Sequence, residues 1–123
     1  MSQAKILLVD DDARVRRVIS SMLSHHPGWE VCGEAADGQE SIDQARATRP
    51  DLVLMDVSMP GMNGLDATRI LRREIPQMEI ILVSQNDPGI VSRQAAEVGA
   101  RACDSRQRSI RHVEPTGEQE EKA

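Results

Sequence analysis

Residues 6–12 of this 123-residue chain read "ILLVDDD", four aliphatic side chains followed directly by three carboxylates. An uninterrupted aliphatic run is typical of a strand that is buried on both faces of a parallel sheet. Three adjacent carboxylates repel one another, and in a poorly solvated site one of them usually takes up a proton. The stretch therefore predicts a buried strand that leads into a site supplied with either a cation or abundant water.

Short apolar runs and helical patterns alternate along the rest of the chain, which is typical of βαβ units and a parallel sheet. The runs predict four buried strands, at 5–9, 30–35, 51–55 and 79–83. A fifth strand and its helix belong in 100–113, but that segment has almost no apolar run. The predicted fold class is α/β with a doubly wound parallel sheet.

Polar residues that favour helix starts separate the strands from the helical patterns. Asp12 is placed to cap the first helix, Asp37 opens the second, and Asn63 can cap the third. Asp87, followed by a proline, is typical of a fourth helix start, and Gly99 of its end. Helical spacing predicts that these apolar residues face the sheet: Val15, Val18, Ile19, Met22 and Leu23; Ile42 and Ala45; Leu65, Ile70 and Leu71; Ile90, Val91, Ala95 and Val98.

Composition excludes several function classes. The net charge of −5 and the single aromatic residue, Trp29, argue against direct nucleic-acid binding and base stacking. Cys32 and Cys103 are far apart, which favours a reduced, cytoplasmic protein over a disulfide framework. No apolar run is long enough for a signal peptide or a membrane span. We expect one domain over 1–114 and a polar, acidic, disordered tail over 115–123.

Polar residues gather where the predicted strands end. The first strand is followed by Asp10, Asp11 and Asp12, the third by Asp56 and the fourth by Ser84. In open α/β sheets, ligands bind beyond the carboxyl ends of the strands. Carboxylates and a hydroxyl at one edge form a hard oxygen site, which suits Mg²⁺ together with a phosphate oxygen. The alternative is that the three adjacent acids are solvated loop residues and one of them is simply a helix cap.

Four stretches resemble the receiver domain of response regulators in two-component signalling. They are "ILLVDDD" (6–12), "GEAADGQE" (33–40), "RPDLVLMDVSMPGMNGLDATRILR" (49–72) and "IILVSQND" (80–87). Their order and spacing fit the family across roughly residues 4–100, and the second stretch looks most like receivers that precede helix-turn-helix output domains. The resemblance implies a flavodoxin-like fold with strand order 2-1-3-4-5.

The resemblance also implies a role for each residue at the strand ends. Asp56 is the expected phosphoacceptor, which takes a phosphoryl group from a sensor histidine kinase or a small phosphodonor. Asp11 and Asp56 are expected to bind Mg²⁺ directly, Asp10 through a water, and Ser58 through its backbone carbonyl. Ser84 is expected to hydrogen-bond the phosphoryl group. The implied protein is a signalling receiver and not an enzyme.

The chain departs from the family at the expected fifth strand. Arg106 stands where the family has lysine, and Cys103 stands where it has an aromatic residue. Arginine keeps the charge but is a poor substitute for a compact ammonium group. Asp104 and Ser105 occupy positions expected to be apolar. We therefore predict a degraded fifth unit that is frayed or relocated. Self-association through this C-terminal region is one possible consequence. An alternative for Arg106 is that it is merely a surface charge.

Two other functions stay open at this level. A pseudo-receiver would use the same fold for protein contacts without phosphorylation, as the degraded fifth unit suggests. A phosphatase of the haloacid-dehalogenase type also opens with a strand leading to Asp-x-Asp, which Asp10 and Asp12 fit, but Ala13 follows where that family has threonine or serine.

Overall fold

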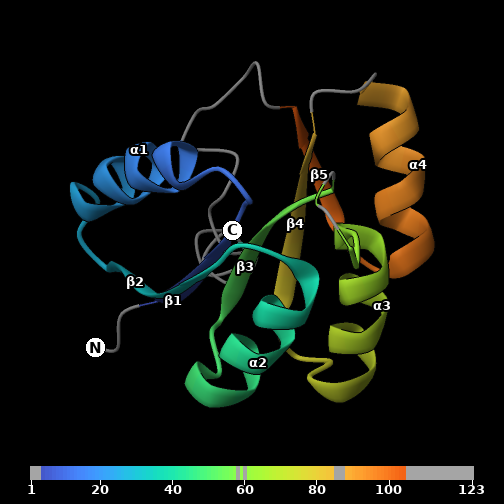
Figure 1. Cartoon of the computed structure of the whole chain (residues 1–123), viewed down its shortest axis with the longest axis horizontal. Coiled ribbons are helices and arrows are strands. Elements are labelled where there is room, and N and C mark those ends of the chain that lie inside the picture. The colour runs from blue at the N-terminus through green and yellow to red at the C-terminus, as the bar shows by residue number, and fades with distance from the viewer. Residues whose placement is uncertain (1–3, 58, 60, 85–87, 105–123) are drawn as a thin grey trace, which may run out of the picture.

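Strands and helices alternate along the chain in the computed structural model, which describes residues 4–57, 59, 61–84 and 88–104 (Figure 1). The strands are β1 (Ala4–Val9), β2 (Trp29–Ala35), β3 (Leu52–Asp56), β4 (Glu79–Ser84) and β5 (Arg101–Asp104). The helices are α1 (Ala13–Ser24), α2 (Gly38–Thr48), α3 (Gly64–Glu74) and α4 (Pro88–Val98).

All strand pairs are parallel, and the sheet order is β2-β1-β3-β4-β5. This order confirms the predicted fold. At the carboxyl end of β1, Val9 lies beside both Ala35 of β2 and Met55 of β3. Asp56, the last residue of β3, lies beside Val83 of β4. The register therefore brings the residues that follow β1 and β3 to the same edge of the sheet.

Helices cover both faces of the sheet, with α2, α3 and α4 on one face and α1 on the other (Figure 1). Alternate residues of a strand point to opposite faces, so β1, β2, β3 and β4 each contribute to two core clusters. The cluster under α2, α3 and α4 includes Leu7, Val9, Val53, Met55, Ile80, Leu82, Ile42, Ala45, Ala67, Leu71, Ala95 and Val98. The cluster on the α1 face consists of Ile6, Leu8, Leu23, Trp29, Leu52, Leu54 and Ile81.

Three predicted helix caps are confirmed by side-chain hydrogen bonds. The side chains of Asp12, Asp37 and Asn63 accept from backbone N–H groups in the first turns of α1, α2 and α3. Gly99 follows α4 with a φ of 78°, the left-handed conformation expected of a glycine that ends a helix. Asp87 lies outside the described residues.

The predicted inner faces of α1 and α4 are only partly correct. Of the five apolar residues predicted to face the sheet from α1, Leu23 alone is buried, and Val18 is 53% exposed. On α4, Val91 is buried as predicted, but Ile90 is 44% exposed. Helical spacing identifies a stripe of apolar residues, whereas the width of that stripe in contact with the sheet depends on how the helix is placed.

The fifth strand forms at the edge of the sheet, beside β4, where the family resemblance places it. The strand is therefore not relocated, whereas a frayed fifth unit, the other form of the prediction, stays a prediction. A parallel ladder depends on backbone groups, and polar residues are common at sheet edges. An ion pair of 3.2 Å between Arg101 of β5 and Glu79 of β4 adds a side-chain contact across the two strands. Residues 105–123, and with them Arg106 and the predicted tail, lie outside the described residues.

Candidate functional site

Three carboxylates meet at the carboxyl edge of the sheet. Asp10 and Asp11 follow β1 directly, and Asp56 ends β3. One carboxylate oxygen from each of the three lies within 4.8 Å of the other two. Asp10 and Asp56 are half-buried, and Asp11 is exposed. The structure therefore brings together the three acids that the sequence predicts for a metal site.

Val57 directly follows β3 and Gly64 begins α3, and backbone hydrogen bonds hold both residues close to Asp56. The N–H of Val57 donates to the Val83 carbonyl at 3.1 Å, and the N–H of Gly64 donates to the Val57 carbonyl at 3.0 Å. A Cβ atom at Gly64 would lie 2.3 Å from the backbone oxygen of Asp56. Glycine at position 64 allows this close backbone turn, because only a residue without a side chain fits there.

The surroundings of Asp10 shift the pKa of its carboxylate. Burial raises the pKa of Asp10, and the negative charges of Asp11 and Asp12 add to that rise. A hydrogen bond of 2.8 Å from the Asp12 N–H to Asp10 Oδ1, and the charge of Arg16, lower the same pKa and offset part of the effect. Asp10 is therefore a carboxylate for which a nearby positive charge is favourable.

The pKa of Asp12 is lowered instead of raised, and the role of this residue is structural. Its side chain caps α1 by accepting from the Arg14 N–H at 2.9 Å, and this hydrogen bond lowers the pKa of Asp12. Asp12 is not one of the three residues whose oxygens converge. Its interpretation as a helix cap is confirmed.

The chemistry of the converging groups fits a hard divalent cation. All three donors are carboxylate oxygens, which Mg²⁺ prefers, and their partial exposure leaves room for the waters that this ion keeps. Softer metals prefer sulfur or imidazole ligands, and neither is among the three. The residues present at this edge therefore fit the Mg²⁺ that the resemblance implies.

One basic residue beside the cluster, Arg16, was not predicted from the sequence. Arg16 of α1 donates from Nη1 to the backbone carbonyl of Asp10. It lies four residues after the capping Asp12, one turn into the helix, among residues that read as an ordinary amphipathic pattern. A signal that could have identified it is an arginine one helical turn beyond a run of acids, where its side chain can reach back to them.

Several predicted site residues are not placed by the structure. Ser58 and Arg106 lie outside the described residues. Ser84 ends β4 with its backbone beside that of Asp104. Their expected contacts with a metal or a phosphoryl group therefore stay predictions. In the described part of the chain, no helix combines the length and the apolar character needed to cross a membrane.

Comparison with known proteins identifies relatives of this chain. Residues 6–106 match the response regulator receiver domain. The chain is 45% identical over 86 residues to the response regulator GacA of Pseudomonas syringae, an alignment that covers 68% of this chain and 40% of GacA. It is 42% identical over 97 residues to a protein-glutamate methylesterase/protein-glutamine glutaminase of Pyrococcus horikoshii, covering 78% of this chain and 26% of that protein.

Solved structures with a similar fold also include response regulators. A two-component response regulator of the LuxR family from Aurantimonas sp. SI85-9A1 superposes with a TM-score of 0.80 and 34% identity, covering 88% of this chain and 76% of that one. The response regulator domain of CheB from Thermotoga maritima superposes with a TM-score of 0.75 and 29% identity, covering 81% and 75% of the two chains. The chain spans well under half of the two longer relatives named above, so the methylesterase activity in one name is a property of that longer protein.

Proposed function

Because the chain belongs to the response regulator receiver domain family, we propose that it accepts a phosphoryl group on Asp56 with the help of Mg²⁺. The observation that carries this proposal is the convergence of three carboxylate oxygens, from Asp10, Asp11 and Asp56, within 4.8 Å at the edge of the sheet. The donor is a sensor histidine kinase or a small phosphodonor. A cytoplasmic location, as the family resemblance implies, is part of the same proposal.

In the proposed reaction, Asp56 is the nucleophile. One oxygen of its carboxylate attacks the phosphorus of the donor, the bond between phosphorus and the donor's leaving atom breaks, and the electron pair of that bond departs with the donor. The product is an acyl phosphate on Asp56. The tight turn at Gly64 fixes the peptide of Asp56, which holds the nucleophile in place for the attack.

The neighbouring acids would hold the metal ion, Asp11 and Asp56 directly and Asp10 through water. When bound, Mg²⁺ supplies positive charge that offsets the repulsion between these carboxylates and the incoming phosphoryl group. The carbonyl of Ser58, the hydroxyl of Ser84 and the charge of Arg106 complete the proposed set, on the strength of the family resemblance alone.

A second candidate function is a pseudo-receiver that makes protein contacts without phosphorylation, with self-association as one form of contact. The observation in its favour is the sequence at the expected switch positions, where Cys103 replaces an aromatic residue and Arg106 replaces a lysine. The match of the acids at the sheet edge to the phosphoacceptor pattern favours the first candidate. The same match favours a phosphoacceptor over a haloacid-dehalogenase phosphatase.

The test is the intact mass of the protein after incubation with acetyl phosphate and Mg²⁺. We expect one phosphoryl adduct on the unchanged protein, and none after Asp56→Asn or in the presence of a chelator. Asp66→Asn is the matched control, because it removes an exposed carboxylate on α3 outside the cluster and should leave the adduct in place. An adduct that survives in Asp56→Asn would move the phosphoacceptor elsewhere, and no adduct on the unchanged protein would favour the pseudo-receiver.

A further inference from the structure

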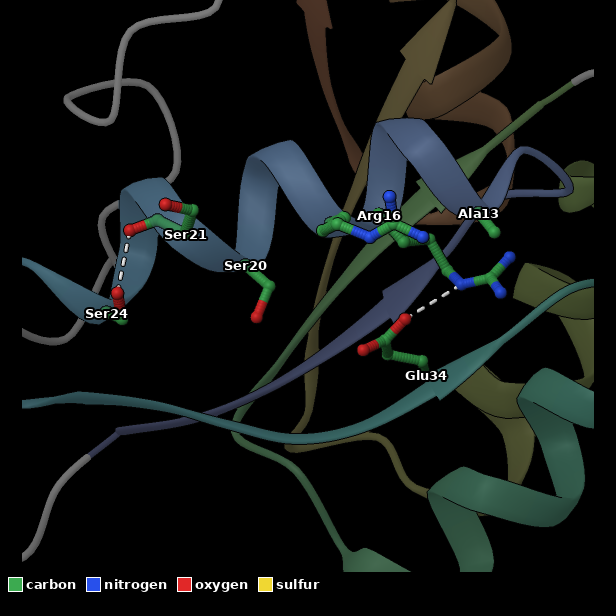
Figure 2. A pocket seen from close by; sticks show the side chains of 7 residues that line it. Ala13, Arg16, Ser20, Ser21, Ser24 and Glu34 are labelled. Carbon is green, nitrogen blue, oxygen red and sulfur yellow. Dashed lines mark hydrogen bonds and ion pairs between the residues drawn. The ribbon is translucent and has the colours of Figure 1, made fainter.

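Arg16 joins three elements of the fold beside the acidic cluster. Its side chain is only 17% exposed, and its Nε–H donates to Oε1 of Glu34 on β2 at 2.9 Å. Its Nη1–H donates to the backbone carbonyl of Asp10, directly after β1. Figure 2 shows the pair of Arg16 and Glu34 spanning from α1 to β2, at the Ala13 end of a polar groove of about 500 Å³.

The peptide of Asp10 is fixed at several points, and Arg16 supplies one of them. The N–H of Asp10 donates to the Ala35 carbonyl at 3.0 Å, which continues the pairing of β1 with β2. The carboxylate accepts from the Asp12 N–H. The carbonyl of Asp10 also begins the peptide unit that leads to Asp11, so the guanidinium holds the plane from which both acids project.

We propose that Arg16 is a positioning residue for the cation site: it fixes the Asp10–Asp11 peptide unit, and Glu34 orients the guanidinium that does so. The inference rests on the proposed Mg²⁺ binding. The arrangement suits arginine because its planar, forked guanidinium can donate in two directions at once, to Glu34 and to the Asp10 carbonyl. A partly buried guanidinium also needs such partners, since burying an unpaired charge is costly.

The sign of the expected effect separates this role from a purely electrostatic one. Arg16 carries a positive charge close to a site for a cation, so charge alone predicts that Mg²⁺ binds more tightly when Arg16 is neutralised. A positioning role predicts the reverse, because the acids lose a fixed orientation. Loss of a residue that orients metal ligands commonly weakens binding by about tenfold or more.

The experiment is an Mg²⁺ titration of the whole chain, followed by the amide chemical shifts of Asp11 and Asp12. We expect Arg16→Met to bind Mg²⁺ about tenfold more weakly than the unchanged protein. Arg16→Lys keeps the charge but cannot donate in two directions with the same geometry, and we expect it to bind severalfold more weakly. Arg17→Met is the matched control, because it removes the same charge from the next position of α1 and should not weaken binding.

The possible outcomes are distinct. Unchanged or tighter Mg²⁺ binding in Arg16→Met overturns the positioning role. An affinity of Arg16→Lys for Mg²⁺ equal to that of the unchanged protein overturns it too. The Arg16→Lys variant also provides the test if Arg16→Met does not fold. Weakening by Arg17→Met as strong as that by Arg16→Met overturns it as well. If the unchanged protein binds no Mg²⁺, the proposed function itself fails, and this result is separable because it needs no variant.

Discussion

Substituting alanine for Gly64 should impair phosphorylation far more than stability alone explains. The added Cβ would lie 2.3 Å from the backbone oxygen of Asp56 and 3.0 Å from its carbonyl carbon. Because Cβ atoms essentially never approach a neighbour within 3.0 Å, the start of α3 and the peptide of Asp56 must separate by about 0.7 Å. Both partners are main chain, so no flexible side chain can absorb this shift.

Two magnitudes follow from that displacement. Forcing an extra methyl group into a close-packed contact costs about 1–3 kcal/mol of folding free energy. Misplacing a reacting group by about 1 Å can cost roughly 10²-fold in rate, so we expect Gly64→Ala to slow phosphorylation of Asp56 by roughly tenfold to 10²-fold. The assay combines urea unfolding with the rate at which acetyl phosphate and Mg²⁺ produce the phosphoryl adduct, followed by intact mass.

Gly28→Ala is the matched control for this experiment. Gly28 has a φ of 96°, and a methyl group added there would meet no atom within 4 Å beyond the adjoining residues. Alanine at this position is therefore strained by its backbone alone, at a cost of about 1–2 kcal/mol. The Gly28 carbonyl accepts from the Ala4 N–H at the opposite end of β1 from Asp10, so Gly28→Ala should lose stability but phosphorylate normally. If Gly64→Ala loses no more phosphorylation rate than Gly28→Ala, the close contact does not position Asp56.

Three further predictions test the site and the fold. Asp11→Ala should abolish Mg²⁺ binding in a titration, and an unchanged affinity would remove Asp11 from the site. Hydrogen bonds from Arg46 lower the pKa of Glu74 in the folded protein. The stability that this carboxylate adds is therefore fully present above the ordinary pKa of glutamate, and it is lost as the pH falls through the lower pKa of the folded state. Urea unfolding should accordingly show Glu74→Gln to be destabilising at neutral pH and neutral in acid, whereas an equal loss at both pH values would contradict the ion pair. Leu71→Ala should lower the free energy of unfolding by about 2–5 kcal/mol in the same assay, because Leu71 is fully buried in the core under α2, α3 and α4. A loss below about 1 kcal/mol would mean that the surrounding core collapses into the cavity left by the leucine.

Local patterns in the sequence predict the order and the starts of the elements. The apolar run before Asp10 becomes β1, and the polar residues Asp12, Asp37 and Asn63 cap the helices that follow, as predicted. These features depend on groups that are close together along the chain, so each can be identified from a short stretch. The convergence of the acids after β1 and β3 was predictable for a related reason, since the carboxyl ends of parallel strands share one edge.

The burial of individual residues could not be predicted in the same way. Val18 and Leu23 belong to the same apolar stripe of α1, yet Val18 is 53% exposed and Leu23 is 2% exposed. In α3, Thr68 is fully buried and donates its hydroxyl hydrogen to the Gly64 carbonyl, although its side chain is polar. Such differences depend on where the whole helix lies against the sheet, which the spacing of residues within that helix does not specify.

The sequence by itself thus determined the order of the elements and the caps of three helices, and it placed Asp10, Asp11 and Asp56 at one edge of the sheet. Only the tertiary structure decided that Arg16 reaches the carbonyl of Asp10 while paired with Glu34, eighteen residues away. The physical reason is that helix caps and strand periodicity are interactions between near neighbours in the chain. A bridge between α1, β1 and β2 exists only once the three elements are packed together.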